Sequence, residues 1–546
     1  MQVNRVVATL RAALIDWRNY LVGIFTQFIA NPVIGRELRV RVRLRRGYLL
    51  QAAYLAFMVL IVALAYQSVV GDADNLRNPF DLQNALVEFY RIVLGTLITL
   101  IALIAPALTA NAITLERERK TIDLLLATPL TARQLLTGKL VASFAFVILL
   151  LALTMPVSAV CVLMGGTSFG DLIRAYVIVA FSTATLCAIA LFTSVYARNS
   201  TLAVLWSYAR VGAFLLFTSM LVSLQAAFSS FAGSGTGVRL LFPMALLNPF
   251  AALYAADTEL DMVYFKLPSW AVAVIVNLLF IRLLLTSAAR KVGLYDKDVM
   301  PSLRRQVLFL APLWIVLNFV PVLARGRFIG LGVLWVISPL EAAMLIALGV
   351  APILALAAWI SPFGKDDDKE CSNDGVFRLS KMFSPAPSGA FPFLLTTWLL
   401  MIGALIGSFA WTRLLTVLGL AFWEFIAALI FYFTGVWVLF WGVGRACSVF
   451  LRGRSLSGAR ALTITILTAL TVLPVFVHLL FYVYPYESAA LNVWLWMPFF
   501  EAMSNPTSIN VPTRLFLWGS VTLLLGVILG AFTSRRTPRV PLEPQD

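Results

Sequence analysis

Long runs of apolar residues recur along the whole chain and alternate with shorter polar segments. A helix of about 18 or more apolar residues is long enough to cross the hydrocarbon core of a bilayer. About twelve such runs predict spans near residues 47–67, 90–114, 140–164, 173–196, 203–227, 269–288, 306–325, 330–360, 391–411, 416–444, 462–484 and 514–533. The pattern therefore predicts an all-α polytopic membrane protein, because helices satisfy their backbone groups internally.

One of these runs, residues 330–360, is too long for a single straight crossing. It contains Pro339 and Pro352, and proline inside a helix removes a backbone donor and clashes with the preceding turn. We therefore expect a kink or a break in this span.

The composition excludes an ordinary soluble protein. Hydrophobic residues make up 61% of the chain and charged residues 12%, against roughly 45–50% and about 25% in soluble domains. A net charge of +16 could indicate a nucleic-acid partner in another context. Here the basic residues follow the membrane topology, so we expect no nucleic-acid partner.

Lys and Arg are concentrated in alternate loops, which predicts the orientation of the chain. With the N-terminus inside, 31 of the 42 basic residues fall in the inner segments and 6 in the outer loops. Basic residues are retained on the cytoplasmic side. We therefore expect an inner (cytoplasmic) membrane protein with both termini in the cytoplasm.

Two segments precede the first span. Residues 1–30 carry charges that interrupt any apolar core of a signal peptide, so an interfacial helix is expected there. Residues 31–46 place a stripe of arginines on one helical face, beside Glu37 in the sequence: Arg36, Arg39, Arg43 and Arg46. Alone, this stripe is equally consistent with a simple positive-inside anchor and with a functional elbow helix.

The loop 116–139, between the second and third spans, has the features of a surface for a protein partner. Ile122, Leu125 and Leu126 form a short apolar stripe behind a charged turn that contains Glu116 and Glu118. Thr128-Pro129 ends this helix, and Thr131-x-x-Gln134 is a capping box that opens the next one. A short amphipathic helix of this kind fits a groove on a partner protein. An interfacial hairpin without a partner is the alternative.

The chain also contains an internal duplication. Residues 246–290 and 495–536 share a Pro-Phe pair followed within three residues by alanine, a polar stretch, a Leu-Pro or Val-Pro pair, an apolar span and basic residues at the end. This predicts two six-span halves, 31–300 and 301–546, in the same orientation. The second half contains a polar cytoplasmic loop, 361–390.

Three motifs together resemble the type-2 (ABC-2) family of ABC transporter permeases over residues 31–290. They are the loop Glu116-x-Glu-x-Lys-Thr-Ile-Asp-x-Leu-Leu-x-Thr-Pro-Leu-Thr, the upstream Asn-Pro-x-x-x-Arg-Glu-Leu run, and Asn248-Pro-Phe-Ala-Ala-Leu. The resemblance implies a membrane subunit of an exporter, with a substrate pathway between its halves. It also implies that residues 116–139 dock into a separate cytosolic P-loop ATPase dimer, with Glu116, Glu118, Ile122, Leu125 and Leu126 as predicted contacts.

The second half departs from the family pattern. Loop 361–390 contains no Glu-x-Glu-x-x-Thr-x-x-Leu-Leu motif. Either residues 377–383 supply a divergent coupling surface, or only the first half engages the ATPase strongly.

The rare residues argue against chemistry in this chain. The single histidine, His478, lies in an apolar stretch, and Cys161, Cys187, Cys371 and Cys447 share no C-x-x-C spacing. Gly138-Lys139 lacks the first glycine and the Ser or Thr of a P-loop. We therefore expect no cofactor on this chain, no enzyme activity, and ATP on the partner subunit; an enzyme or a scaffold is not favoured.

Three charged residues, Arg210, Glu341 and Glu424, fall inside predicted spans. A charge within the bilayer is costly, and pairing or a water-filled cavity is the usual relief. An Arg210–carboxylate pair, contact with substrate, or ion coupling would each explain them. Ion coupling by these residues would make the protein an ion-coupled secondary transporter, which is the alternative function. The substrate is not indicated, because an apolar pathway suits lipids, peptides, drugs and polysaccharides alike.

Overall fold

The computed structural model describes the long helices and several of the segments that connect them. The described residues are 45–69, 79–121, 132–231, 245–254, 258–292, 299–325, 339–362, 382–383, 389–412, 420–451, 456–481 and 511–535. Residues 1–44, which include the predicted N-terminal helix and most of the predicted elbow, lie outside these ranges.

The described chain is almost entirely helical, which confirms the predicted fold class. Its long helices are α3 (Arg45–Val69), α4 (Pro79–Thr109), α7 (Ala132–Leu163), α8 (Phe169–Tyr196), α9 (Ser200–Phe231), α11 (Ser269–Val292), α12 (Val299–Arg325), α13 (Pro339–Ile360), α15 (Ala390–Trp411), α16 (Leu420–Phe450), α17 (Leu456–Phe481) and α19 (Val511–Arg535). Within the described ranges, ten helices are long and apolar enough to cross a membrane. Two more apolar segments, in α13 and α17, are shorter, so the count of twelve stays a prediction.

The chain folds into two compact units, each of which packs mainly against itself. Unit 1 contains residues Met1–Leu260 and Phe265–Leu303, and unit 2 contains Asp261–Tyr264 and Arg304–Asp546. The first part of the second copy of the predicted duplication, residues 495–510, lies outside the described ranges. The duplication therefore stays a prediction.

Helix α8 is the centre of unit 1 and packs against α4, α7, α9 and α11. Buried hydrogen bonds add to this apolar packing. The Thr185 hydroxyl of α8 donates to Asn277 Oδ1 of α11 at 2.6 Å, and the hydroxyls of Tyr176 and Ser158 join α8 to α7 at 2.8 Å. In an apolar bilayer, bonds of this kind and close packing hold helices together.

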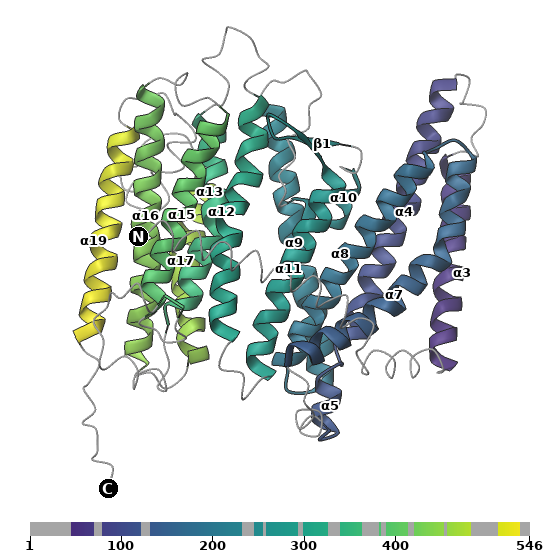
Figure 1. Ribbon diagram of the computed structural model, residues 1–546, viewed down its shortest axis with the longest axis horizontal. Helices are drawn as coiled ribbons and strands as arrows, with labels where there is room; N and C mark the ends of the chain where they lie inside the picture. Colours follow the sequence, from purple (N-terminus) through teal and green to yellow (C-terminus); the bar gives the residue numbers. More distant parts are fainter. Residues whose placement is uncertain are drawn as a thin grey trace. The chain divides into compact units, whose positions relative to one another are not determined.

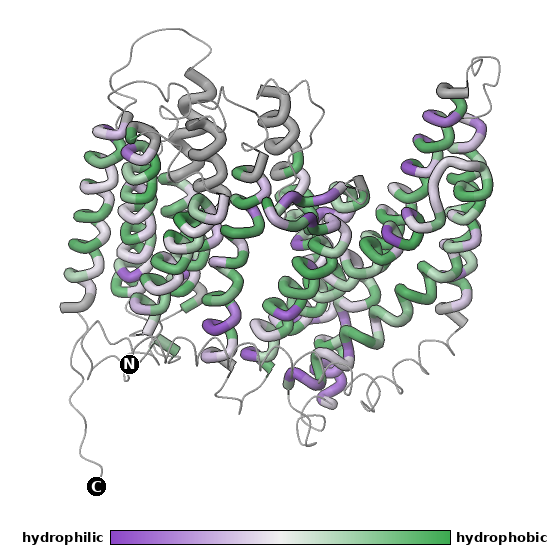
Figure 2. Tube along the Cα trace, turned by 45° about the horizontal axis from the view of Figure 1, so that its top comes forward, coloured by the Kyte–Doolittle hydropathy of each residue, from purple (hydrophilic) through white to green (hydrophobic). Residues whose placement is uncertain are grey.

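The two ends of unit 1 carry different short elements. The five-residue helix α5 (Thr114–Glu118) lies beyond the helix ends on one side. Toward the other side lie η2 (Ala245–Leu247), α10 (Pro249–Tyr254) and a hairpin of β1 (Glu259–Asp261) and β2 (Lys266–Pro268) (Figure 1). Figure 2 shows hydrophobic positions along the long helices and a group of hydrophilic positions at α5. The α5 end is therefore rich in charged residues, and the hairpin at the opposite end also carries Glu259, Asp261 and Lys266.

Unit 2 is built around the packing of α16 against α19, with α13 on α16. Glycines make the close approach possible. A Cβ on Gly442 of α16 would lie 2.5 Å from the carbonyl oxygen of Gly526 in α19, and a Cβ on Gly526 would lie 2.6 Å from the backbone nitrogen of Leu439. The two backbones thus touch, as they do in other membrane helix pairs with small residues at the interface.

The predicted kink in residues 330–360 is only partly within the described chain. Helix α13 begins at Pro339 and contains Pro352, while residues 326–338 lie outside the described ranges. Pro339 thus occupies the first helical position, where its missing N–H costs nothing.

Candidate functional site

The first part of the predicted coupling loop folds as α5 and is fixed at its start by α8. The hydroxyl oxygen of Ser194, two residues before the end of α8, accepts hydrogen bonds from the backbone N–H groups of Ile113 and Thr114, at 3.0 and 3.3 Å. The first N–H groups of a helix have no partner within the helix. Ser194 therefore supplies the cap that α5 lacks in its own sequence.

Glu116 connects α5 to α7. Its Oε1 lies 3.1 Å from Nζ of Lys139, whose side chain is only 3% exposed. Its Oε2 also accepts a hydrogen bond from the Thr121 hydroxyl. A buried ammonium is costly unless it is paired, so Glu116 compensates for the charge of Lys139 inside the protein.

Arg117 connects α5 to the end of α8. Its guanidinium donates from Nη1 to the carbonyl of Ala197 at 2.9 Å and from Nη2 to the carbonyl of Val195 at 3.2 Å. The last carbonyls of a helix lack partners within it, and a cation there also favours the helix dipole. Arg117 thus caps the C-terminus of α8.

Glu118 connects α5 to the start of α9. Its carboxylate accepts hydrogen bonds from the backbone N–H of Ser200 at 2.7 Å and from the Ser200 hydroxyl at 2.8 Å. Ser200 is the first residue of α9. A carboxylate at a helix N-terminus satisfies a free N–H and favours the dipole, so Glu118 holds the N-terminus of α9.

Three consecutive side chains of α5 therefore hold three membrane helices, α7, α8 and α9. The sequence singled out Glu116 and Glu118 as contacts of a partner protein, but the structure gives both carboxylates partners within the chain. Arg117 was not predicted, and neither were Ser194 and Ser200. Ile122, Leu125 and Leu126 lie outside the described residues, so their role stays a prediction.

Helix α5 ends in a tight turn at Lys120. The N–H of Thr121 bonds to the carbonyl of Glu116 and the N–H of Lys120 to that of Arg117, while Lys120 has φ of 55°. This is a Schellman motif, which usually places glycine in the left-handed position. Helix α7 begins at Ala132, one residue after the predicted cap Thr131, which itself lies outside the described residues. Leu115, Arg119 and Lys120 are exposed at this end.

The other predicted charged residues are only partly described. Of the predicted elbow residues, only the backbone of Arg46 is described, in the first turn of α3. Arg210 donates to the Thr193 hydroxyl at 3.3 Å and lies over the Phe192 ring. Glu424 is exposed, and the side chain of Glu341 lies outside the described residues. A pair between Arg210 and either carboxylate therefore stays a prediction.

The Asn248 motif lies toward the end of unit 1 opposite α5 and joins α10 to α9. Asn248 is buried, and its Oδ1 accepts hydrogen bonds from the N–H groups of Phe250 at 2.9 Å and Ala251 at 3.4 Å. Its Nδ2 donates to the hydroxyls of Thr218 and Ser219 in α9. One side chain thus caps α10 and fixes it to a membrane helix.

We expect Asn248→Ala to lower the free energy of unfolding by about 2–3 kcal/mol, because a helix cap and two buried bonds are lost. Thermal unfolding of the purified chain in detergent measures this change. The Asn248→Asp variant keeps the capping oxygen and loses the two Nδ2 donors, so it should fall between the wild type and Asn248→Ala. Equal stability of all three proteins would contradict this role.

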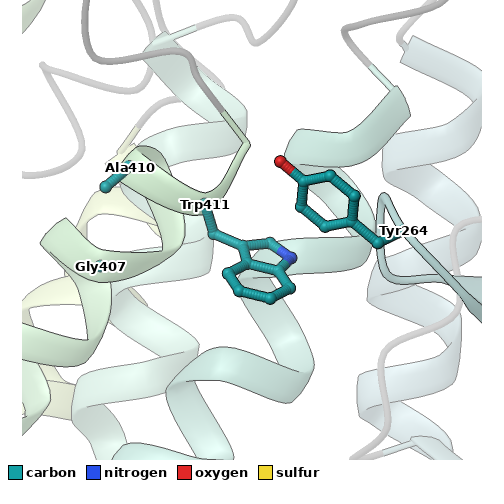
Figure 3. Close-up of a pocket in the computed structure, with 4 residues that line it drawn as sticks. All are labelled: Tyr264, Gly407, Ala410 and Trp411. Carbon is teal, nitrogen blue, oxygen red and sulfur yellow. The ribbon is translucent and has the colours of Figure 1, made fainter.

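Unit 2 carries an aromatic pocket at its surface. It has a volume of about 590 Å³ and is lined by Tyr264, Gly407, Ala410 and Trp411 (Figure 3). The Tyr264 and Trp411 rings meet edge to face at 5.0 Å, and the Trp411 indole N–H donates to the carbonyl of Met262 at 3.0 Å. Aromatic side chains with one polar end are typical of the membrane–water interface.

The described chain thus defines a multi-pass helical membrane protein, and the comparison with known families identifies its kind. The model of the ABC-2 family transporter proteins matches residues 32–298. This segment belongs to that family, which confirms the resemblance seen in the loop, the elbow and the Asn248 motif. Residues 32–298, about half of the chain, thus match a family of membrane transport components of the ABC permease type. A comparison with curated proteins gives no match.

Proposed function

We propose that this chain is the membrane-spanning permease subunit of an ATP-driven exporter, and that a separate cytosolic P-loop ATPase dimer binds and hydrolyses the ATP. The observation that carries the proposal is the anchoring of α5 by Glu116, Arg117 and Glu118 to α7, α8 and α9. A force applied at α5 reaches three membrane helices at once. An interfacial hairpin without a partner would not need such rigid attachment.

The ATPase acts on the loop that begins with α5. Closure of the ATPase dimer moves residues 116–139, and the bonds of α5 pass this movement to the ends of α7, α8 and α9. Movement of one bundle against another then exposes the substrate pathway to alternate sides of the membrane. This chain performs no chemistry and binds no cofactor in this scheme.

The α5 end of unit 1 faces the cytoplasm in this proposal. Arg119 and Lys120 are exposed there. The last turn of α11 contributes Arg290 and Lys291, and Lys291 lies over the ring of Tyr196 at the end of α8. Basic residues are retained on the inner side of the cytoplasmic membrane. The same rule places both termini inside, with Arg36, Glu37, Arg39, Arg43 and Arg46 in an elbow along the inner headgroups.

The test is co-purification of the ATPase with the affinity-tagged chain from its native cells. We expect the double change Leu125→Asp and Leu126→Asp to release the ATPase, since carboxylates do not enter an apolar groove. ATP hydrolysis in the eluate and peptide mass spectrometry for a P-loop protein measure the loss. The control is Ser372→Asp with Asn373→Asp, which adds the same charge to loop 361–390.

Two outcomes would contradict the proposal. One is an unchanged amount of ATPase on the doubly substituted chain. The other is transport in reconstituted vesicles that needs a pH gradient and no ATP, and that is lost in Glu341→Gln or Glu424→Gln. That second result would identify an ion-coupled secondary transporter.

A further inference from the structure

A pocket beside α5 combines polar and apolar walls. It has a volume of about 520 Å³ and lies between the α4–α5 turn and one face of α9. Its polar end is formed by Asn111, Ser200 and Thr201, and Val204, Leu205 and Tyr208 continue it along α9. All six residues belong to unit 1.

The position of the pocket matches the depth of a lipid headgroup. Ser200 is the first residue of a candidate membrane span, Ser200–Ser219, so it lies at one end of the segment that can cross the hydrocarbon core. Tyr208 lies two turns further along, roughly 12 Å deeper at 1.5 Å per residue. The polar end of the pocket is therefore at headgroup level, and its apolar end follows the first part of an acyl chain.

The surroundings of the pocket are exposed and apolar. On the same helix, Leu205 is 64% exposed and Trp206 is 54% exposed. Side chains of this kind on a membrane span face lipid, because lipid lets apolar groups lie outside. An amphiphile therefore reaches the pocket from the side.

The polar end of the pocket favours a cationic donor. Asn111 Oδ1 is buried and has no hydrogen-bond partner, although the side chain as a whole is partly exposed. Asn111 is one of the residues that line the pocket, so its amide can present this oxygen to a ligand there. An unsatisfied buried carbonyl is unfavourable, which favours a ligand that supplies an N–H.

The carboxylate of Glu118 adds a negative charge to the same end. Glu118 is bonded to Ser200, a wall residue of the pocket. Among the residues that the structure describes, Glu118 is bonded to Ser200 alone and forms no ion pair. Arg117, its neighbour, uses its guanidinium on the carbonyls of α8.

We infer that this pocket binds a phospholipid with a primary ammonium headgroup. The ammonium donates to Asn111 Oδ1 near the carboxylate of Glu118, and an acyl chain lies along Val204, Leu205 and Tyr208. The bound lipid is then part of the joint at which α5 meets α9. The inference does not depend on the ATPase, because it concerns the chain alone.

The experiment measures which lipids the full chain retains. The purified chain is incorporated into nanodiscs of phosphatidylethanolamine, phosphatidylcholine and phosphatidylglycerol in equal amounts, and native mass spectrometry counts the bound lipids without ATP. Phosphatidylcholine has the same charge but no N–H donor. We expect phosphatidylethanolamine to be retained about tenfold over phosphatidylcholine, as one charge-assisted bond implies.

Two variants on one helix test the position of the site. Leu205→Trp fills the pocket and should remove the preference, whereas Leu216→Trp changes a residue of the same helix that is 74% exposed and outside the pocket. Asn111→Ala should also reduce the preference. Equal retention of the three lipids, a preference for phosphatidylglycerol, no retained lipid, or equal behaviour of the two tryptophan variants would each overturn the inference.

Discussion

The variants Glu116→Gln and Lys139→Met are each expected to destabilise the chain by about 3 kcal/mol and to reduce ATP-driven transport at least about tenfold. Lys139 is 3% exposed and Glu116 is 24% exposed. Removing one partner of a buried ion pair leaves the other charge uncompensated, which costs about 3–5 kcal/mol. We use the lower end of this range because Glu116 is partly solvated. Thermal unfolding in detergent and transport with the ATPase in vesicles measure the two effects.

Charge reversal is the sharper form of this test. The double change Glu116→Lys with Lys139→Glu restores an ion pair in the same place, so it should recover most of the stability that either single change loses. The control is Lys266→Gln, which removes an ion pair whose partners are 67% and 57% exposed. Exposed pairs contribute less than about 1 kcal/mol. If Glu116→Gln is as stable as Lys266→Gln, the pair does not hold α5 to α7.

The sequence predicts the helices well where they cross lipid, because the bilayer requires these segments to be long and apolar. Apolar runs of membrane length are a direct consequence of the bilayer thickness. Helix α8 (Phe169–Tyr196) contains the whole predicted span 173–196. The start of α7 was missed by eight residues, because the span was predicted to begin at residue 140 and the helix begins at Ala132. Arg133 and Lys139 lie in that first part, and hydropathy cannot show that Glu116 compensates Lys139.

The candidate site was predicted in sequence position but not in its contacts. The loop motif identified Glu116 and Glu118, yet Lys139 is 23 residues from Glu116, and Ser200 is 82 residues from Glu118. Local patterns carry no information about partners at such separations. The short polar turn between α8 and α9 would have been the only local signal for Ser200, because helix N-termini favour serine.

The close packing of α16 on α19 was also beyond the sequence analysis. Gly435 and Gly442 are seven residues apart, and so are Gly519 and Gly526. Seven-residue spacing keeps one face of a helix toward its partner. A single helix, however, does not reveal which other helix its glycines meet. Only the structure shows that the backbone of α16 contacts the backbone of α19 at these glycines.

The variant Gly526→Ala is therefore expected to destabilise unit 2 by about 3 kcal/mol, the upper part of the range for overpacked cores. A Cβ at this position would lie 2.6 Å from the backbone nitrogen of Leu439 and from the carbonyl of Val438. Because these atoms belong to the backbone of α16, no side-chain rotation relieves the clash. The two helices must separate by several tenths of an ångström, and dispersion contacts are lost along the whole interface.

Gly403 of α15 is the matched control, because a Cβ there would meet no atom within 4 Å. Gly403→Ala should leave the chain as stable as the wild type or stabilise it by up to about 1 kcal/mol, since alanine favours helix more than glycine does. Trp437 and Trp441 lie on α16 and report its packing, so thermal unfolding followed by tryptophan fluorescence measures both variants. The same small substitution should thus destabilise the chain at Gly526 and not at Gly403. If both variants unfold at the same temperature, α16 and α19 do not pack through Gly526.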